Sequence, residues 1–411
     1  MIIRTRHNIF KQLAEVIMSK RLSSKDTHPT LSQQMRQALV CTLKTHLPLG
    51  VEGQELDDEM LWDILLYASV NGTTIESACN ELADVPSGNT VRPHLQETLD
   101  PSCFGVYALE DQLNAVLQSQ LPARLLRRRK RKGYEIGIDL IEIPYHGKPV
   151  HCPEEVSRGL AKSGTTHFHR YATLAIVHHH QRYEVALTFV WADESMDQVV
   201  DRLLEQADQL GLRLRRAYLD KGFCRREVFT VLRQRRLPYL IPIPVKGQSG
   251  GIRQLFTGRK SYRTTYTFNA NKPQAYTTEV IVLRCYSKGR YGRHGSEWFV
   301  YAAYGMEQVP LHQIFDLYRR RFGMESGYRQ MHQVRARTTS PSPTLRLLLV
   351  GLAFLLYNVY ILFRPIAHTT RTYGTRLRRL WLTLGRMKRL IQRFLEHLWG
   401  TISMPQVSVP P

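Results

Sequence analysis

The sequence contains few cysteines, and none of them form the paired spacing of a metal or disulfide motif. The six cysteines are scattered, without a CxxC pattern: Cys41, Cys79, Cys103, Cys152, Cys224 and Cys285. This argues against a zinc ribbon and a disulfide framework, and it favours a reducing compartment. The N-terminus lacks the apolar stretch followed by small residues that a secretory signal needs, so we expect a cytoplasmic location.

Long hydrophobic runs are scarce as well. The one candidate, residues 347–363, has 17 residues without a formal charge, at the lower edge of a membrane span. Asn358 interrupts this run and arginines bracket it at 346 and 364. We therefore expect a buried helix and no membrane partner. The sequence has no internal repeat and no low-complexity tract.

Acidic residues are the scarcer charged class. The 411 residues include 57 Lys+Arg and 35 Asp+Glu, which gives a formal charge of +22. A balance of this kind suits a polyanionic partner, and nucleic acid is the one we expect. The length exceeds one ordinary core, so we expect two or three domains.

Residues 1–122 have the apolar spacing of an all-α region. Predicted helices cover 8–19, 31–47, 57–69 and 73–82, and another begins near 87. The last two have the rhythm of a helix-turn-helix, and the residues that would face a DNA major groove are Asn89, Thr90, Arg92 and His94. An ordinary bundle of short helices is the alternative, and Pro93 inside the presumed reading helix disfavours DNA reading.

Residues 133–245 alternate between strands and helices. The predicted elements, in chain order, are strands 134–143, 171–178 and 183–191, helix 196–210, strand 214–219, helix 226–235 and strand 239–245. This βββαβαβ order is that of an α/β, RNase H-like core. A basic linker, residues 123–132, precedes it and carries seven positive charges between positions 124 and 132.

The remaining chain divides into three predicted segments. Residues 246–305 form a β-rich insertion with strands over 262–268, 276–286 and 297–304. Residues 306–365 complete the core with one helix over 311–334 and the buried apolar helix. Residues 366–411 form a basic amphipathic tail, with C-terminal helix 375–399.

Three carboxylates lie in distant segments that we expect to converge on one site. Asp139 lies in the first strand, Asp220 ends a later strand, and Glu325 lies in helix 311–334. Glu142 is a rival of Asp139, but it would point to the opposite face of a regular strand. Three acids can hold two divalent ions, Mg²⁺ or Mn²⁺, and such a pair supports phosphodiester cleavage.

Other polar side chains recur at helical spacing around Glu325. Tyr318, Arg321, Glu325, Arg329 and His332 are separated by 3, 4, 4 and 3 residues, so they would share one helical face. The two arginines would position the carboxylate or contact phosphates. An exposed helix with ion pairs four residues apart would show the same spacing, so this pattern alone leaves both interpretations open.

Tyr318, Arg321 and Glu325 resemble the YxxRxxxE signature of insertion-sequence transposases with a DDE catalytic domain, in the retroviral-integrase-like superfamily. The resemblance covers roughly residues 133–365. Residues 137–139 are similar to the family's first catalytic strand, and residues 220–223 to its second acidic motif. His332 stands where the signature often has lysine, and Arg329 and Arg335 are alternatives for its DNA contact.

The resemblance implies metal-dependent cleavage at transposon ends by Asp139, Asp220 and Glu325, followed by transfer of the 3′-hydroxyl into target DNA. It also implies a homodimer on DNA, a prokaryotic cytoplasm with nucleoid association, and no small-molecule cofactor. Further candidate DNA contacts are Lys221, Trp298, Arg127, Arg128, Arg129 and Lys130. Trp298 would stack on a flipped base, although a packed strand tryptophan is the more frequent case.

Two other functions stay open at the level of sequence. A domesticated descendant would bind DNA in a salt-sensitive way without cleaving it. A metal-dependent nuclease would cleave DNA and never join the cut 3′ end to a second duplex.

Overall fold

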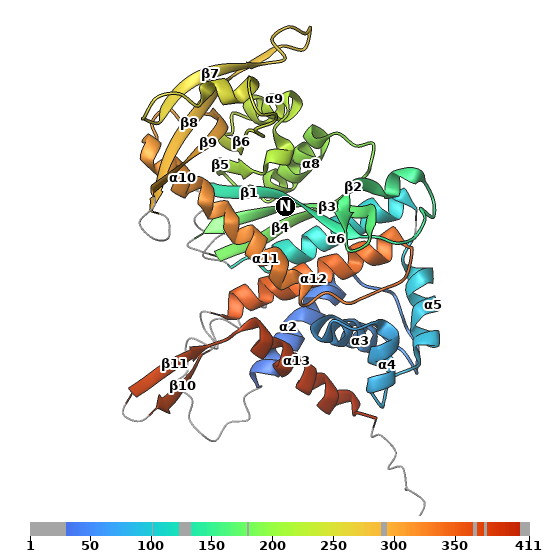
Figure 1. Cartoon of the computed structure of the whole chain (residues 1–411). Helices are drawn as coiled ribbons and strands as arrows, with labels where there is room; N and C mark the ends of the chain where they lie inside the picture. The colour runs from blue at the N-terminus through green and yellow to red at the C-terminus, as the bar shows by residue number, and fades with distance from the viewer. Residues whose placement is uncertain are drawn as a thin grey trace, which may run out of the picture. The chain divides into compact units, whose positions relative to one another are not determined.

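The computed structural model describes residues 30–100, 102–122, 133–178, 181–288, 294–364, 368–373 and 376–402 (Figure 1). The chain divides into two compact units. One contains residues 1–125, 145–156 and 327–411, and the other contains residues 126–144 and 157–326. The basic linker 123–132 and the predicted helix 8–19 lie outside the described residues.

The first unit is mainly helical. Its helices are α2 (Leu31–His46), α3 (Asp58–Asn71), α4 (Ile75–Glu81), α5 (Gly88–Thr98), α6 (Cys103–Ser119), α12 (Pro343–Phe363) and α13 (Leu384–Trp399). Polar caps explain several helix starts: the Asp57 carboxylate accepts the Met60 amide, and the Thr74 hydroxyl accepts the Ser77 amide. Gly72, in the left-handed region at φ 64°, ends α3.

Helix α12 is the predicted apolar helix, and it is buried as expected. It is the one helix in the described ranges that is long and apolar enough to cross a membrane, yet 89% of its most apolar window is buried within the protein. Ser342 caps its first turn by accepting the Leu345 amide, and Pro343 occupies the first helical position. Helices α2, α3 and α6 pack against α12.

The helices α4 and α5 lie where a helix-turn-helix was predicted, and DNA reading by them stays a prediction. Asn89 and Arg92 are exposed on α5, and Arg92 lies 3.4 Å from the Glu76 carboxylate of α4. Pro93 stands in the second turn of α5, beyond the position where proline is normally tolerated. Its ring is exposed, while Val91 and Leu95 anchor the buried side of the helix.

The second unit is built on one nine-stranded, mostly antiparallel sheet, so the mixed α/β class is confirmed. Its strands are β1 (Tyr134–Pro144), β2 (Ser157–Lys162), β3 (Thr165–His178), β4 (Gln181–Val190), β5 (Leu214–Leu219), β6 (Tyr239–Pro242), β7 (Tyr262–Phe268), β8 (Tyr276–Lys288) and β9 (His294–Tyr304). The order is β2-β3-β1-β5-β6-β9-β8-β7, with β4 also paired to β3. Only the pairs β1–β5 and β5–β6 are parallel.

The helices of this unit are α8 (Met196–Gln209), α9 (Arg226–Gln234), α10 (Leu311–Arg319) and the start of α11 (Gly323–His332). Helix α8 packs on β3 and β4. Helix α10 buries Ile314, Leu317 and Tyr318 against β8 and β9, and each buried aliphatic side chain contributes about 2 kcal/mol. The inserted strands β8 and β9 therefore form the surface against which α10 packs.

Three predicted elements were wrong in extent. The helix predicted over 311–334 is interrupted by a 3-10 turn, Arg320–Phe322, between α10 and α11. The helix predicted over 375–399 begins only at Leu384, because residues 376–381 form strand β11 (Arg376–Trp381) against the threonine-rich β10 (His368–Tyr373). The strand predicted over 239–245 ends at Pro242.

The strand β2 was not predicted, and β3 begins six residues earlier than its predicted start at 171. The two strands form a hairpin whose turn residues, Ser163 and Gly164, have positive φ angles of 52° and 80°. Positive φ at both central residues matches the twist of a tight hairpin. The residues of β2 are mostly polar and exposed, so its sequence lacks the apolar alternation that predicts a strand.

Candidate active site

Asp139 and Asp220 come together because β1 and β5 are parallel neighbours. Ile138 pairs with Leu219 across the two strands, so the next residue of each chain segment lies at the same level. Asp139 is buried, with 7% of its surface exposed, while Asp220 begins the turn that follows β5. The register of one parallel pair therefore brings the first two predicted acids side by side.

A glycine allows the third acid to approach this edge. Gly137 and Asp139 lie on the same face of β1, since side chains alternate along a strand. A Cβ atom at Gly137 would lie 2.2 Å from the sulfur of Met324, which precedes Glu325. The absence of that atom lets the first turn of α11 lie directly on β1.

The guanidinium of Arg321 stands at the centre of the three carboxylates. One terminal nitrogen lies 2.5 Å from Asp139 Oδ2. The other donates to Asp220 Oδ1 at 3.2 Å and lies 3.6 Å from Glu325 Oε1. The Arg321 side chain is only 4% exposed. The three predicted acids thus converge, and one buried cation links them.

Tyr318 fixes the orientation of this arginine. Its hydroxyl accepts a hydrogen bond from Arg321 Nε at 3.1 Å and donates to the Leu219 carbonyl at 3.1 Å. Burial raises the pKa of Tyr318 above its ordinary value, so the hydroxyl keeps the proton that it donates. The tyrosine, arginine and glutamate of the signature thus form one connected set of contacts.

The buried, neighbouring carboxylates of the cluster need a positive charge close by to remain ionised. Burial raises the pKa of Asp139 to about 6; the Arg321 charge opposes this rise, and the Asp220 and Glu325 charges add to it. Burial lowers the pKa of Arg321, but the charges of the neighbouring acids outweigh burial and raise this pKa above its ordinary value. Burial likewise raises the pKa of Glu184, on β4, to about 7.

An all-carboxylate donor set suits a hard divalent ion such as Mg²⁺ or Mn²⁺, and Asp139, Asp220 and Glu325 are the residues that would hold it. Across the described ranges, however, no three His, Cys, Asp or Glu side chains are arranged to hold a metal ion as they stand. Between these three acids the guanidinium of Arg321 supplies the compensating charge.

The rival acid Glu142 lies elsewhere. Its carboxylate pairs with Arg170 of β3 at 2.8 Å, and the side chain is 37% exposed. Glu142 is three positions from Asp139, so strand alternation directs it to the opposite face of β1.

Three further predicted DNA contacts that the structure describes are exposed. Lys221 is exposed in the turn after Asp220, and Arg329 and His332 are exposed in the last turn of α11. The 3-10 turn means that Tyr318 and His332 do not share one continuous helical face. Arg127, Arg128, Arg129 and Lys130 lie outside the described residues.

Trp298 of β9 is packed against neighbouring side chains. Its ring stacks on Phe256, with centroids 5.5 Å apart and planes 3° from parallel, and the Arg284 guanidinium lies 5.2 Å from the ring centre. Stacking of Trp298 on a DNA base stays a prediction, and it would compete with these contacts.

Sequence reasoning missed a layer of charged residues beneath the signature segment. Glu135 of β1 pairs with Arg216 of β5 at 3.3 Å and with Arg320 at 2.8 Å, while Arg182 and Glu184 are buried in β4. The signal was present as charged residues inside otherwise apolar strand runs, which buried strands rarely contain without a partner.

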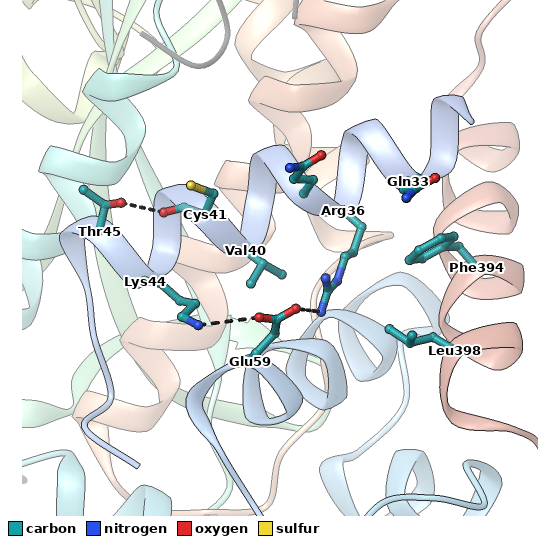
Figure 2. Close-up of a pocket in the computed structure, with 10 residues that line it drawn as sticks. Gln33, Arg36, Val40, Cys41, Lys44, Thr45, Glu59, Phe394 and Leu398 are labelled. Carbon is teal, nitrogen blue, oxygen red and sulfur yellow. Dashed lines mark hydrogen bonds and ion pairs between the residues drawn. The ribbon is translucent and has the colours of Figure 1, made fainter. Parts of the chain in front are cut away.

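A cavity of about 590 Å³ lies in the helical unit, between α2, α3 and α13 (Figure 2). Glu59 in its wall lies 2.6 Å from Arg36 and 3.5 Å from Lys44, and Phe394 and Leu398 line the α13 side. Both basic groups are engaged with the Glu59 carboxylate, which is the one acid among the described residues that line the cavity.

Comparisons with known proteins identify the family of the chain. No curated protein matches the sequence. A solved structure of a piggyBac transposase, in a synaptic complex with hairpin DNA, is similar at a TM-score of 0.44 and 10% identity, covering 98% of this chain and 80% of that chain. Residues 138–359 match the model of the transposase DDE domain. Because this match spans more than half of the 411 residues and contains all three acids and Arg321, the chain belongs to the family of transposases with a DDE domain.

Proposed function

We propose that this protein is an insertion-sequence transposase that cleaves transposon ends and joins their 3′-hydroxyls to target DNA. The observation that carries the proposal is the convergence of Asp139, Asp220 and Glu325, from three segments, on the buried guanidinium of Arg321. Residues with this chemistry would hold two divalent ions, which activate the attacking oxygen and stabilise charge on the leaving one. DNA ends and target DNA are the proposed substrates.

The proposed catalytic core is RNase H-like. Its support is the order β4-β3-β1-β5-β6, in which β1, β3 and β4 are antiparallel and β5 and β6 run parallel to β1. The helices α8 and α9 connect β4 to β5 and β5 to β6, and apart from the short additional strand β2 this order is consistent with the proposed core. The acids lie on β1 and directly after β5, where such a core would present them.

In this proposal Arg321 has a defined role before DNA binds. It neutralises the acids and keeps their oxygens directed at one point, and Tyr318 holds it there. A phosphate of bound DNA would accept the same guanidinium donors. A homodimer that joins two ends, in a prokaryotic cytoplasm, completes the proposal.

The test is cleavage of a labelled duplex that carries the terminal inverted repeat of the element, with Mg²⁺ or Mn²⁺. Asp220→Ala and Glu325→Gln are expected to bind the duplex and to lose cleavage by at least about a thousandfold, because metal-ligand removal eliminates the charge stabilisation of the transition state. Glu142→Gln is the matched control, since this acid pairs with Arg170 instead.

The same assay separates the competing functions. Joining of the cut 3′ end to a second duplex supports the transposase, whereas cleavage without joining would indicate a nuclease. Salt-sensitive binding with no cleavage under either metal would indicate a DNA-binding descendant. Cleavage by Asp220→Ala at the wild-type rate would refute the assignment of the acids.

A further inference from the structure

We infer that Arg182 of β4 is a positioning residue, which holds the turn between α10 and α11 and thereby places Arg321 and Glu325. This inference rests on the proposed function, since it concerns the same cluster of acids. Arg182 is 7% exposed and lies 138 residues before Arg320 in the sequence.

The turn needs an external partner because it breaks the helix. In a continuous helix each carbonyl accepts the amide four residues ahead, and a 3-10 turn disturbs this pattern. At Arg320, the first residue of the turn, the main-chain carbonyl accepts a hydrogen bond from a terminal nitrogen of Arg182. A donor from the sheet therefore satisfies a carbonyl at the break.

The guanidinium of Arg182 also sets the distance between the turn and the sheet. A Cβ atom at Gly323 would lie 2.8 Å from Arg182 Cζ and Nε, so the first residue of α11 lies directly on this group. Arg182 extends from the sheet face that carries Asp139, because Glu135 pairs with Val177 and Val177 pairs with Arg182. The 3-10 turn between α10 and α11 therefore packs on the buried guanidinium of Arg182, which acts as its anchor.

Three consecutive constraints follow along the chain. Arg182 holds the main chain at Arg320, the Arg320 side chain pairs with Glu135 at 2.8 Å, and the next residue, Arg321, reaches the acids. Rotation of the turn would move Arg321 and the first turn of α11 together. Small displacements of groups that support metal ligands typically weaken metal binding and catalysis strongly.

The variants that test this are Arg182→Met, which keeps an unbranched, flexible side chain but removes its donors, and Arg182→Lys, which keeps a cation and a donor. Arg170→Met is the matched control. Arg170 also lies in the sheet and also donates to a main-chain carbonyl, that of Arg158 at 2.8 Å, and it pairs with Glu142 outside the cluster.

Three measurements on the full-length protein report on the role. We expect Arg182→Met to speed hydrogen exchange at the amides of 320–325, to weaken Mn²⁺ binding measured by electron paramagnetic resonance roughly tenfold or more, and to lower kcat for cleavage without changing KM for DNA. Arg182→Lys is expected to recover part of each loss, and Arg170→Met to match the wild type in all three.

A second variant guards against misfolding of Arg182→Met. Gly323→Ala keeps the arginine but displaces its guanidinium, and the helical backbone at Gly323, with φ −61°, tolerates alanine. It should weaken Mn²⁺ binding in the same direction. Wild-type exchange and Mn²⁺ affinity in both variants would overturn the inference.

Failure of the proposed function would give a different set of results. If the wild-type protein bound no Mn²⁺ and cleaved no DNA, the proposed transposase function would be refuted. Faster hydrogen exchange at the amides of 320–325 in Arg182→Met would still support the anchor. Wild-type exchange and Mn²⁺ affinity in Arg182→Met and Gly323→Ala, together with normal DNA cleavage by the wild-type protein, would refute the anchor alone.

Discussion

At the scale of single residues, the candidate site is organised by one cation among several acids. Carboxylates brought together in a partly buried place repel one another and lose hydration, and both effects raise the pKa of Asp139. Arg321 offsets this with contacts to all three acids and to Tyr318. A planar guanidinium with several donors can serve this many oxygens at once, which lysine cannot.

Replacement of this cation should therefore be costly in the absence of metal. Arg321→Gln is expected to lower the free energy of unfolding by about 3 kcal/mol in EDTA, because removal of one partner leaves Asp139 as a buried, uncompensated acid. Urea denaturation measures the change. Arg320→Gln removes a pair whose arginine is 53% exposed, and it should cost less than about 1 kcal/mol. Equal losses in the two variants would contradict the central role of Arg321.

At the scale of elements, the signature segment is held from two sides. Helix α10 packs its apolar face on the inserted strands β8 and β9, and α11 begins on β1 at Gly137. The insertion is therefore part of the sheet that supports the signature, and the 3-10 turn lets the two helices follow different surfaces. Close contact at Gly137 is the tightest of these constraints.

A methyl group at Gly137 should disturb the site from a distance. Gly137→Ala is expected to lower stability by roughly 1–3 kcal/mol and to reduce cleavage, because its Cβ would meet Met324 at 2.2 Å and force α11 away from β1. Gly222→Ala is the control, since its Cβ would meet nothing closer than Leu140 at 3.9 Å.

Stability and cleavage rates of both alanine variants, together with the double variant Gly137→Ala/Met324→Ala, give the measurement. Relief of the defect in the double variant would assign it to the Met324 contact. A Gly137→Ala protein with wild-type cleavage would show that α11 does not depend on this approach.

At the scale of the whole molecule, the charge of +22 is the dominant property. Part of the positive charge is used internally: Arg216, Arg320 and Arg321 pair with buried or half-buried acids, and Arg182 donates to a main-chain carbonyl. The run of arginines and lysines at 124–132 lies outside the described residues, and its contact with DNA phosphates stays a prediction.

Replacement of Arg127, Arg128, Arg129 and Lys130 by glutamine tests that run. If all four contact DNA phosphates, the slope of log affinity against log salt concentration should become shallower by about 3.6, at roughly 0.9 per contact. Fluorescence anisotropy over a salt series measures the slope. Asp220→Ala should keep the wild-type slope, and an unchanged slope in the quadruple variant would show that these residues are only a linker.

The sequence by itself determined the positions of many helices and strands and the family to which the protein belongs. Apolar alternation placed β1, β5 and the inserted strands, three- and four-residue spacing placed α2, α3 and α8, and the signature around Glu325 indicated the family. These features depend on side chains that are near one another in the chain, so their periodicity can be recognised without knowledge of the fold.

Only the tertiary structure decided how the site is assembled. The break at 320–322, the hairpin β10–β11 inside a predicted helix, and the placement of Arg321 among the acids all depend on partners distant in sequence; Arg321 and Asp139 are 182 residues apart. Burial and strand register decide such contacts, because a buried charge must find its partner wherever packing brings one. No periodicity in the sequence encodes that partner. The charges of Arg182 and Glu184 inside an apolar strand are evident in the sequence, but only the folded sheet decided which groups they face.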